Sequence, residues 1–200
     1  MEISTQQVKE LREATGAGIL DCRKALMQHD GDFDKAVAWL REKGLAAAAK
    51  KVGREAREGK LEQYSHAGGR VGVIVEVNCE TDFVARTERF QAFAHELALH
   101  IAAANPKYMD AADVPADVLD SEQTIARNKA VEEGRPEKAL DKIVAGRLEK
   151  FYQENCLLKQ PFIKDESKTI TDLLKETVAA IGENVIIRRF ARWELGEPLN

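Results

Sequence analysis

The sequence predicts an α+β protein in which three short N-terminal helices precede a small antiparallel sheet covered by helices. Two observations predict this class. Apolar residues recur at helical spacing in the first 44 residues and again after residue 88, whereas the period changes to two between residues 61 and 79. The 200 residues, of which 44% are hydrophobic, suffice for one substantial core and a smaller module.

Three short helices are expected in the first 44 residues. Ser4 begins a capping box for the first helix, which ends at Gly16, and Asp32 caps a third helix that ends before Gly44. A core this small is marginal, and exposed apolar residues on such bundles often bind a partner. We therefore predict a docking module over residues 1–44.

Residues 45–57 combine a run of alanines with several cations, and both residue types favour an exposed helical linker. A local basic contact with RNA is the less favoured interpretation of the cations Lys50, Lys51, Arg54 and Arg57.

Residues 58–200 are expected to form the α+β core. Valines alternate with other residues before Cys79, which predicts a hairpin with one buried face and a turn at Gly68-Gly69. A helix should cover that face through its apolar stripe of Phe90, Phe93, Ala94, Leu97, Ala98 and Ile101.

The second half of this core should contain a helical hairpin. Pro115 and Pro136 each open a helix, and Gly134-Arg135 separates the two. Thr169 then caps a helix that closes at Gly182, before a strand over residues 185–195.

The overall charge is close to balanced, with 30 Lys and Arg against 34 Asp and Glu and a net charge of -4. No global positive field favours nucleic-acid binding, and no segment has the roughly 20 apolar residues of a membrane span. The opening residues carry neither the basic nor the apolar part of a signal peptide. We expect a cytoplasmic protein without membrane contact, with its three cysteines as buried thiols.

Catalytic and metal motifs are mostly absent. His95 and His100 resemble a zinc-protease pair, but their five-residue spacing turns the two rings away from a shared metal, so we expect ordinary histidines on a partly exposed helix. Glu80 and Asp82 could share one side of a strand end, although no histidine or lysine nearby completes an acid/base site. No cofactor and no metal are expected.

Phe83 follows two polar residues at the point where the valine alternation ends. Its side chain could fold back over the sheet as a core residue, or it could stay exposed as a binding anchor beside a charge. The pattern alone favours neither interpretation.

Several segments together resemble one family. The chain is similar to bacterial translation elongation factor Ts in six ordered stretches, which cover essentially the whole chain: Val8-Lys9-Glu10-Leu11-Arg12, Thr15-Gly16-Ala17-Gly18, Asp21-Cys22-Arg23-Lys24-Ala25-Leu26, Glu76 to Arg86, Gln160-Pro161-Phe162-Ile163 and Ile186-Ile187-Arg188-Arg189-Phe190.

The resemblance implies a guanine-nucleotide exchange factor for elongation factor Tu that binds the GTPase without catalysing a reaction. It implies a first module similar to ubiquitin-associated domains, and an Asp-Phe pair that disturbs the magnesium and phosphate site of the GTPase. Carried over to this chain, the contact residues are Thr81, Asp82, Phe83 and Val84, then Arg12, Ile19 and Leu20 of the module, and Ile163 and Lys164 of a further contact segment.

One departure from longer family members concerns the core, which is present here as a single repeat. The chain resembles the short class in which two chains pair through their sheets, so we expect a homodimer and a dimerisation role for residues 58–200.

Two other functions remain as alternatives. An RNA-binding translation protein would use the cations of residues 45–57 together with Arg188 and Arg189. A carboxylate hydrolase would use Glu80 and Asp82 in a deep pocket.

Overall fold

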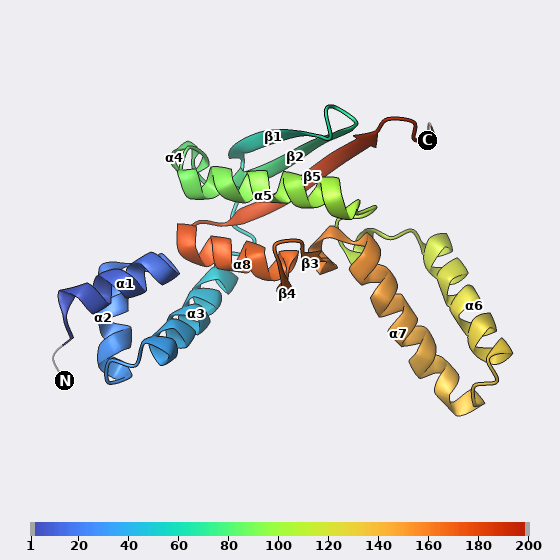
Figure 1. Ribbon diagram of the computed structural model, residues 1–200, viewed down its shortest axis with the longest axis horizontal. Coiled ribbons are helices and arrows are strands. Elements are labelled where there is room, and N and C mark those ends of the chain that lie inside the picture. Colours follow the sequence, from blue (N-terminus) through green and yellow to red (C-terminus); the bar gives the residue numbers. More distant parts are fainter. Residues whose placement is uncertain (1–2, 199–200) are drawn as a thin grey trace. The chain divides into compact units, whose positions relative to one another are not determined.

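Helices make up most of residues 3–198, the part of the chain that the computed structural model describes (Figure 1). These residues divide into two units. The first holds the described residues up to Leu61 with Glu76–Ala94 and Leu174–Arg188, and the second holds Glu62–Val75, His95–Leu173 and the described residues from Arg189. The outermost residues of the predicted 1–44 and 58–200 segments, 1–2 and 199–200, lie outside the described residues.

The first unit begins with the expected three-helix bundle, made of α1 (Thr5–Thr15), α2 (Ile19–Gln28) and α3 (Phe33–Ala49). Ser4 completes the predicted capping box, and Gly16 ends α1 in the left-handed region with a φ of 67°. The bundle core is small and apolar, and it consists of Val8, Leu11, Cys22, Ala25, Leu26, Ala36 and Leu40.

The third helix does not end before Gly44 as predicted, but continues to Ala49. Gly44 lies against α8 (Ile170–Ile181), where an added Cβ would approach the Ala179 Cβ to 3.1 Å. This glycine therefore permits close helix packing and is not a helix terminator. The predicted helical linker over residues 45–57 is helical only up to Ala49, and Gly53 beyond it has a positive φ of 88° that no helix allows.

The sheet contains β1 (Glu58–His66), β2 (Val71–Cys79) and β5 (Val185–Glu194), in the order β1-β2-β5. The predicted hairpin joins β1 to β2, and its turn uses Gly68 and Gly69 at positive φ. The alternating side chains of β2 are buried as expected, namely Val71, Val73, Val75, Val77 and Cys79. The α+β class is thereby confirmed.

The apolar stripe expected after the hairpin belongs to α5 (Glu88–Ala104), and all six of its predicted core residues are buried. In the second unit, α6 (Ala116–Glu132) and α7 (Glu137–Asn155) form the predicted helical hairpin (Figure 1).

The segment after α7 contains a short antiparallel ribbon that the sequence did not suggest, β3 (Pro161–Phe162) with β4 (Asp165–Thr169). A four-residue helix, α4 (Asp82–Ala85), follows β2.

Gly59 gives a direct test of how closely β1 and β2 approach each other. It has a φ of 147°, and an added Cβ would collide with the carbonyl oxygen of Val77. We expect Gly59→Ala to lower the free energy of unfolding by about 2 kcal/mol or more, because either the backbone or the strand pairing must shift. Urea unfolding followed by circular dichroism measures this change.

The matched control is Gly72→Ala in β2, where an added Cβ meets open space. We expect it to change the free energy of unfolding by less than about 0.5 kcal/mol. Equal effects of the two substitutions would contradict the proposed backbone contact.

Candidate functional site

The candidate contact segment Thr81–Val84 follows the end of β2 and forms the first turn of α4. Thr81 is the N-cap, and its hydroxyl accepts a hydrogen bond from the Val84 amide at 3.3 Å. The Phe83 side chain is 84% exposed, so it does not fold back over the sheet. Of the two interpretations that the sequence left open, the exposed aromatic is the one observed.

Asp82 stands beside Phe83 and accepts a hydrogen bond from Arg86 Nη2 at 2.9 Å. Both side chains of this pair are more than half exposed. Exposed ion pairs contribute little to stability, on the order of 0 to 1 kcal/mol. A partner can therefore separate Asp82 from Arg86 at low cost.

The backbone just before Phe83 is fixed by Glu183, a residue that the sequence analysis missed. Its Oε2 accepts hydrogen bonds from the amides of Glu80 and Thr81 at 3.1 and 3.0 Å, and its Oε1 accepts one from the Thr81 hydroxyl at 2.7 Å. Glu183 lies about 100 positions away in sequence, and no local spacing signals such a contact.

Glu80 interacts with the same loop, but here the carboxylate comes from the end of β2 and the backbone amide from the loop after α8. Its Oε1 accepts a hydrogen bond from the Asn184 amide at 2.6 Å, and its Oε2 lies 3.7 Å from Arg54 Nη1. Glu80 and Asp82 thus serve separate partners. The described residues also contain no group of three or more acidic, histidine or cysteine side chains that could hold a metal ion. This arrangement gives no support to the hydrolase alternative.

Cys79 is buried at the end of β2, and its thiol donates a hydrogen bond to the Thr81 carbonyl at 3.2 Å. Burial, together with the nearby Glu183 carboxylate, raises the pKa of Cys79 to about 11. The thiol is therefore protonated at neutral pH and supports the segment as a hydrogen-bond donor. All three cysteines are free and buried, as the sequence predicted.

The three candidate residues of the bundle are exposed. Arg12 lies on α1, while Ile19 and Leu20 begin α2 and are 58% and 83% exposed. Met27, seven residues after Leu20 and on the same side of α2, is also exposed and was missed by the sequence analysis. The heptad spacing of Leu20 and Met27 was the available signal. Together they give α2 an exposed apolar face.

Ile163 and Lys164 lie in the second unit, at the turn between β3 and β4. Ile163 is 41% exposed, and Lys164 forms an ion pair with Glu96 at 2.6 Å. Both side chains are accessible at one end of the short ribbon.

A buried histidine fixes the ribbon that carries Ile163. His100 is fully buried, which corrects the expectation of an ordinary histidine on a partly exposed helix. Its Nδ1 accepts a hydrogen bond from the Ile163 amide at 3.4 Å, so the ring proton resides on Nε2, which donates to Gln160 Oε1 at 2.9 Å. The Gln160 amide group donates in turn to the carbonyls of Ala104 and Glu154. His95 bonds a different residue, Glu62, at 2.9 Å.

Three arginines of the RNA-binding alternative lie beside carboxylates. Arg54 faces Glu80, Arg57 lies 2.6 Å from Glu55, and Arg188 lies 3.7 Å from Glu76. A carboxylate beside an arginine lowers the local positive potential that would attract an RNA backbone, so these neighbours give the RNA-binding alternative little support.

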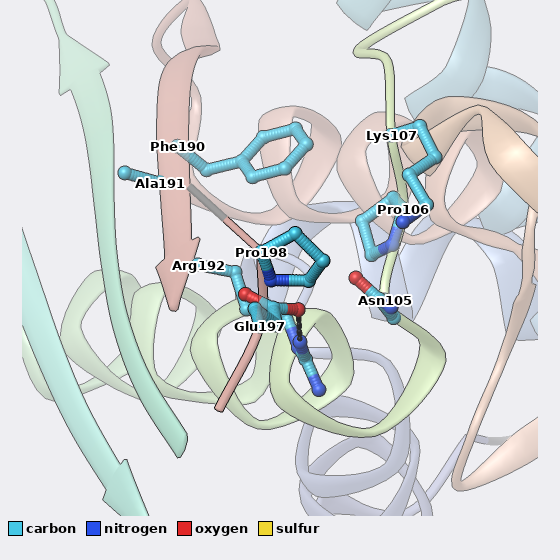
Figure 2. Close-up of a pocket in the computed structure, with 8 residues that line it drawn as sticks. All are labelled: Asn105, Pro106, Lys107, Phe190, Ala191, Arg192, Glu197 and Pro198. Atoms are coloured by element: carbon cyan, nitrogen blue, oxygen red, sulfur yellow. Dashed lines mark hydrogen bonds and ion pairs between the residues drawn. The ribbon is translucent and has the colours of Figure 1, made fainter. Parts of the chain in front are cut away.

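A hollow of about 380 Å³ lies in the second unit, between Asn105–Lys107 and the end of β5 (Figure 2). Arg192 lines it, and ion pairs with Glu194 and Glu197 at 2.7 and 3.1 Å hold its guanidinium. None of the predicted site residues lines this hollow. The two carboxylates thus compensate the charge of Arg192.

Within residues 3–198, every helix is too short or too polar to cross a bilayer.

An exposed aromatic on a fixed loop and an exposed apolar helix face are typical of a protein that binds another protein. Residues 27–197 match the family described as Elongation factor TS. The chain is 61% identical to an elongation factor Ts of Caldanaerobacter subterraneus subsp. tengcongensis, with 98% of each chain covered. It is 60% identical to one from a Thermoanaerobacter species and 56% identical to one from Moorella thermoacetica, with 98% of this chain and 97% of each relative covered.

The chain therefore belongs to the elongation factor Ts family. This is a family of nucleotide-exchange factors in protein synthesis and not of enzymes.

The buried His100 predicts how stability depends on pH. Burial lowers the pKa of His100 below its ordinary value of 6.5, so below that pH the unfolded chain binds a proton that the folded chain excludes. The contribution of His100 to the free energy of unfolding is therefore fully present above pH 6.5. It decreases as the pH falls, by at most about 1.4 kcal/mol per pH unit. Urea unfolding at about pH 7.5 and about pH 5.5 measures it.

We expect His100→Gln to be less stable at neutral pH but to show a smaller loss of stability on acidification. His66→Gln is the control, because His66 is exposed on β1. If acidification lowers the free energy of unfolding of His100→Gln as much as that of the unmodified protein, the pH dependence belongs to other groups.

Proposed function

We propose that this protein binds elongation factor Tu in its GDP form, disturbs the magnesium and phosphate site of the GTPase and so promotes GDP release. It then stays on the nucleotide-free GTPase until GTP enters. The exposed Phe83 on the segment Thr81–Val84, within the stretch Glu76 to Arg86 that resembles the family, is the observation that carries this proposal.

Phe83 has the properties of an interface anchor. A rigid aromatic side chain that is exposed in the free protein can fill an apolar pocket of a partner and lose all of its solvent contact there. On this proposal, Phe83 inserts into elongation factor Tu beside the nucleotide, and the other residues of the segment set its approach.

Asp82 brings a negative charge next to that anchor. The magnesium ion of a GTPase bridges phosphate oxygens and is the largest local charge in the site, so a small displacement of its ligands weakens nucleotide binding. The weak surface pairing of Asp82 with Arg86 leaves this carboxylate free to act on that shell. By linkage, a factor that weakens GDP binding must itself bind the nucleotide-free GTPase more tightly.

Two further contacts with elongation factor Tu are proposed. Arg12, Ile19 and Leu20 form a docking surface on the bundle, to which the exposed Met27 adds apolar area. Ile163 and Lys164 form the other contact at the β3–β4 turn. We also propose that the bundle resembles ubiquitin-associated domains, that residues 1–44 and 58–200 act as docking and core segments, and that the protein works in the cytoplasm.

A homodimer is proposed from the single core repeat. β5 is a ten-residue strand at one edge of the sheet, and edge strands offer unpaired backbone groups to a second chain. In the first unit, the exposed Leu61 of β1 and Ile186 of β5 add apolar area to the sheet.

The direct test of the function is the release of labelled GDP from elongation factor Tu. Catalytic amounts of this protein should accelerate release, and the fold acceleration should be smaller at low magnesium concentration, because the ion that the factor would displace is then largely missing already. Release at the intrinsic rate with saturating protein would reject the proposal.

Phe83→Ala should leave the fold unchanged, because the side chain contributes little to the core. We expect it to reduce stimulated GDP release by roughly 30-fold, the equivalent of the 2 kcal/mol typical of a hot spot. Stopped-flow fluorescence of labelled GDP measures the rate.

The control is Val52→Ala, which removes part of another exposed apolar side chain, 77% exposed, in the turn after α3. Its exchange rate should match that of the unmodified protein. A Phe83→Ala protein with full activity would show that Phe83 is not the anchor.

The homodimer predicts a particle of twice the 22.3 kDa mass of one chain. Light scattering after gel filtration measures the mass, and Ile186→Lys should shift it towards a single chain because a buried charge opposes pairing. A mass of one chain at high protein concentration would reject the dimer.

A further inference from the structure

The loop between α8 and β5 makes a set of contacts that the proposed contact surfaces do not explain. Gly182 ends α8 in the left-handed region with a φ of 88°, and Glu183 and Asn184 follow it before β5 begins. We propose that Glu183 is a positioning residue for nucleotide exchange, which holds Thr81 and thereby sets the orientation of Phe83. This inference rests on the exchange function proposed above.

The first observation is the number of donors that converge on one side chain. Two backbone amides and one hydroxyl donate to the Glu183 carboxylate, at distances of 2.7 to 3.1 Å. Hydrogen bonds to an ionised acceptor are roughly twice as strong as neutral ones. The carboxylate thus fixes two consecutive peptide units just past the end of β2.

The second observation is that the reverse contact also exists. Glu80 accepts the Asn184 amide at 2.6 Å, while the Asn184 side chain donates to the Arg54 carbonyl at 2.7 Å. Asn184 is buried, so these hydrogen bonds have little competition from water. Each loop therefore supplies a carboxylate to the backbone of the other, and neither can turn independently.

The third observation concerns α4 itself, which buries none of its four side chains. Core packing consequently does not set the orientation of this short helix. The Thr81 hydroxyl donates a hydrogen bond to the Glu183 carboxylate and accepts one from the Val84 amide. Thr81 therefore joins the loop after α8 to the first turn of α4. Phe83 lies inside that turn, and its direction follows from these hydrogen bonds.

This geometry predicts which kinetic parameter changes when Glu183 is altered. The bundle and the β3–β4 turn still bind the GTPase, so the protein concentration that gives half of the maximal rate should change by less than about twofold. The maximal rate of GDP release should fall by roughly tenfold in Glu183→Ala, because Phe83 and Asp82 are no longer held in one orientation.

The variants are chosen to separate positioning from charge. Glu183→Gln can keep all three contacts, because its amide oxygen accepts from the two backbone amides and its NH₂ group donates to a reoriented Thr81 hydroxyl. It should retain most of the maximal rate. Glu183→Asp keeps the charge but shortens the side chain by one methylene, and it should resemble Glu183→Ala. Glu149→Ala, at an exposed position of α7, is the matched control and should be fully active.

The experiment measures GDP release from elongation factor Tu by stopped flow over a range of factor concentrations, with circular dichroism to verify each fold. A normal maximal rate in Glu183→Ala overturns the inference. So does an equal loss in Glu183→Gln, because that variant keeps the hydrogen bonds. If Glu183→Ala does not fold, the Glu183→Asp and Glu183→Gln rates decide the question in the same way.

Amide hydrogen exchange of the free protein separates this inference from the exchange function. Glu183→Ala should increase the exchange rate of the Thr81 amide by roughly tenfold or more, and Glu183→Gln should increase it less. If the unmodified protein does not accelerate GDP release, the proposed function fails, and the positioning role for exchange fails with it. An unprotected Thr81 amide in the unmodified protein overturns the positioning inference alone.

Discussion

The loops that follow β2 and α8 are joined by two carboxylates, each of which accepts hydrogen bonds from the backbone of the other loop. The position of the exposed aromatic depends on these hydrogen bonds. Glu183 accepts from the backbone of Glu80 and Thr81, and Glu80 accepts from the backbone of Asn184. Buried apolar contacts stabilise the strand and helices on either side, but they end before Phe83. Beyond the end of the hydrophobic packing, directional hydrogen bonds therefore fix the segment Thr81–Val84 and leave its side chains accessible to solvent.

The site combines a rigid support with side chains that have few partners of their own. The backbone of Glu80 and Thr81 is fixed, the thiol of Cys79 is buried beneath it, and Phe83 remains in water. Such preorganisation lowers the entropy that must be lost on binding, so more of the contact energy remains available to the complex. The buried His100 supports the β3–β4 turn in a comparable manner, through the Ile163 amide and Gln160.

Local periodicity was enough to predict much of the fold. The alternation of Val71, Val73, Val75 and Val77 and the stripe of α5 follow from spacings within single elements, and their burial is confirmed. The end of α3 was predicted incorrectly because a glycine terminates a helix only when its φ is positive, and Gly44 is instead required by a helix far away in sequence. The contacts of Glu183 could not be predicted because a hydrogen bond across 100 positions leaves no periodic trace. For Phe83, the pattern located the residue at a strand end but could not determine its exposure, which depends on how the following turn leaves the sheet.

The close approach of α3 and α8 at Gly44 and Ala179 has a consequence for how the sequence can diverge. The 3.1 Å that separates an imagined Cβ at residue 44 from the Ala179 side chain leaves room for almost no added volume. An alanine at 44 demands a slight local adjustment, whereas a larger residue demands a glycine at 179 or a wider separation of the helices. The two positions should therefore covary in size among homologous chains, and a large residue at both would mark a chain in which these two helices pack differently.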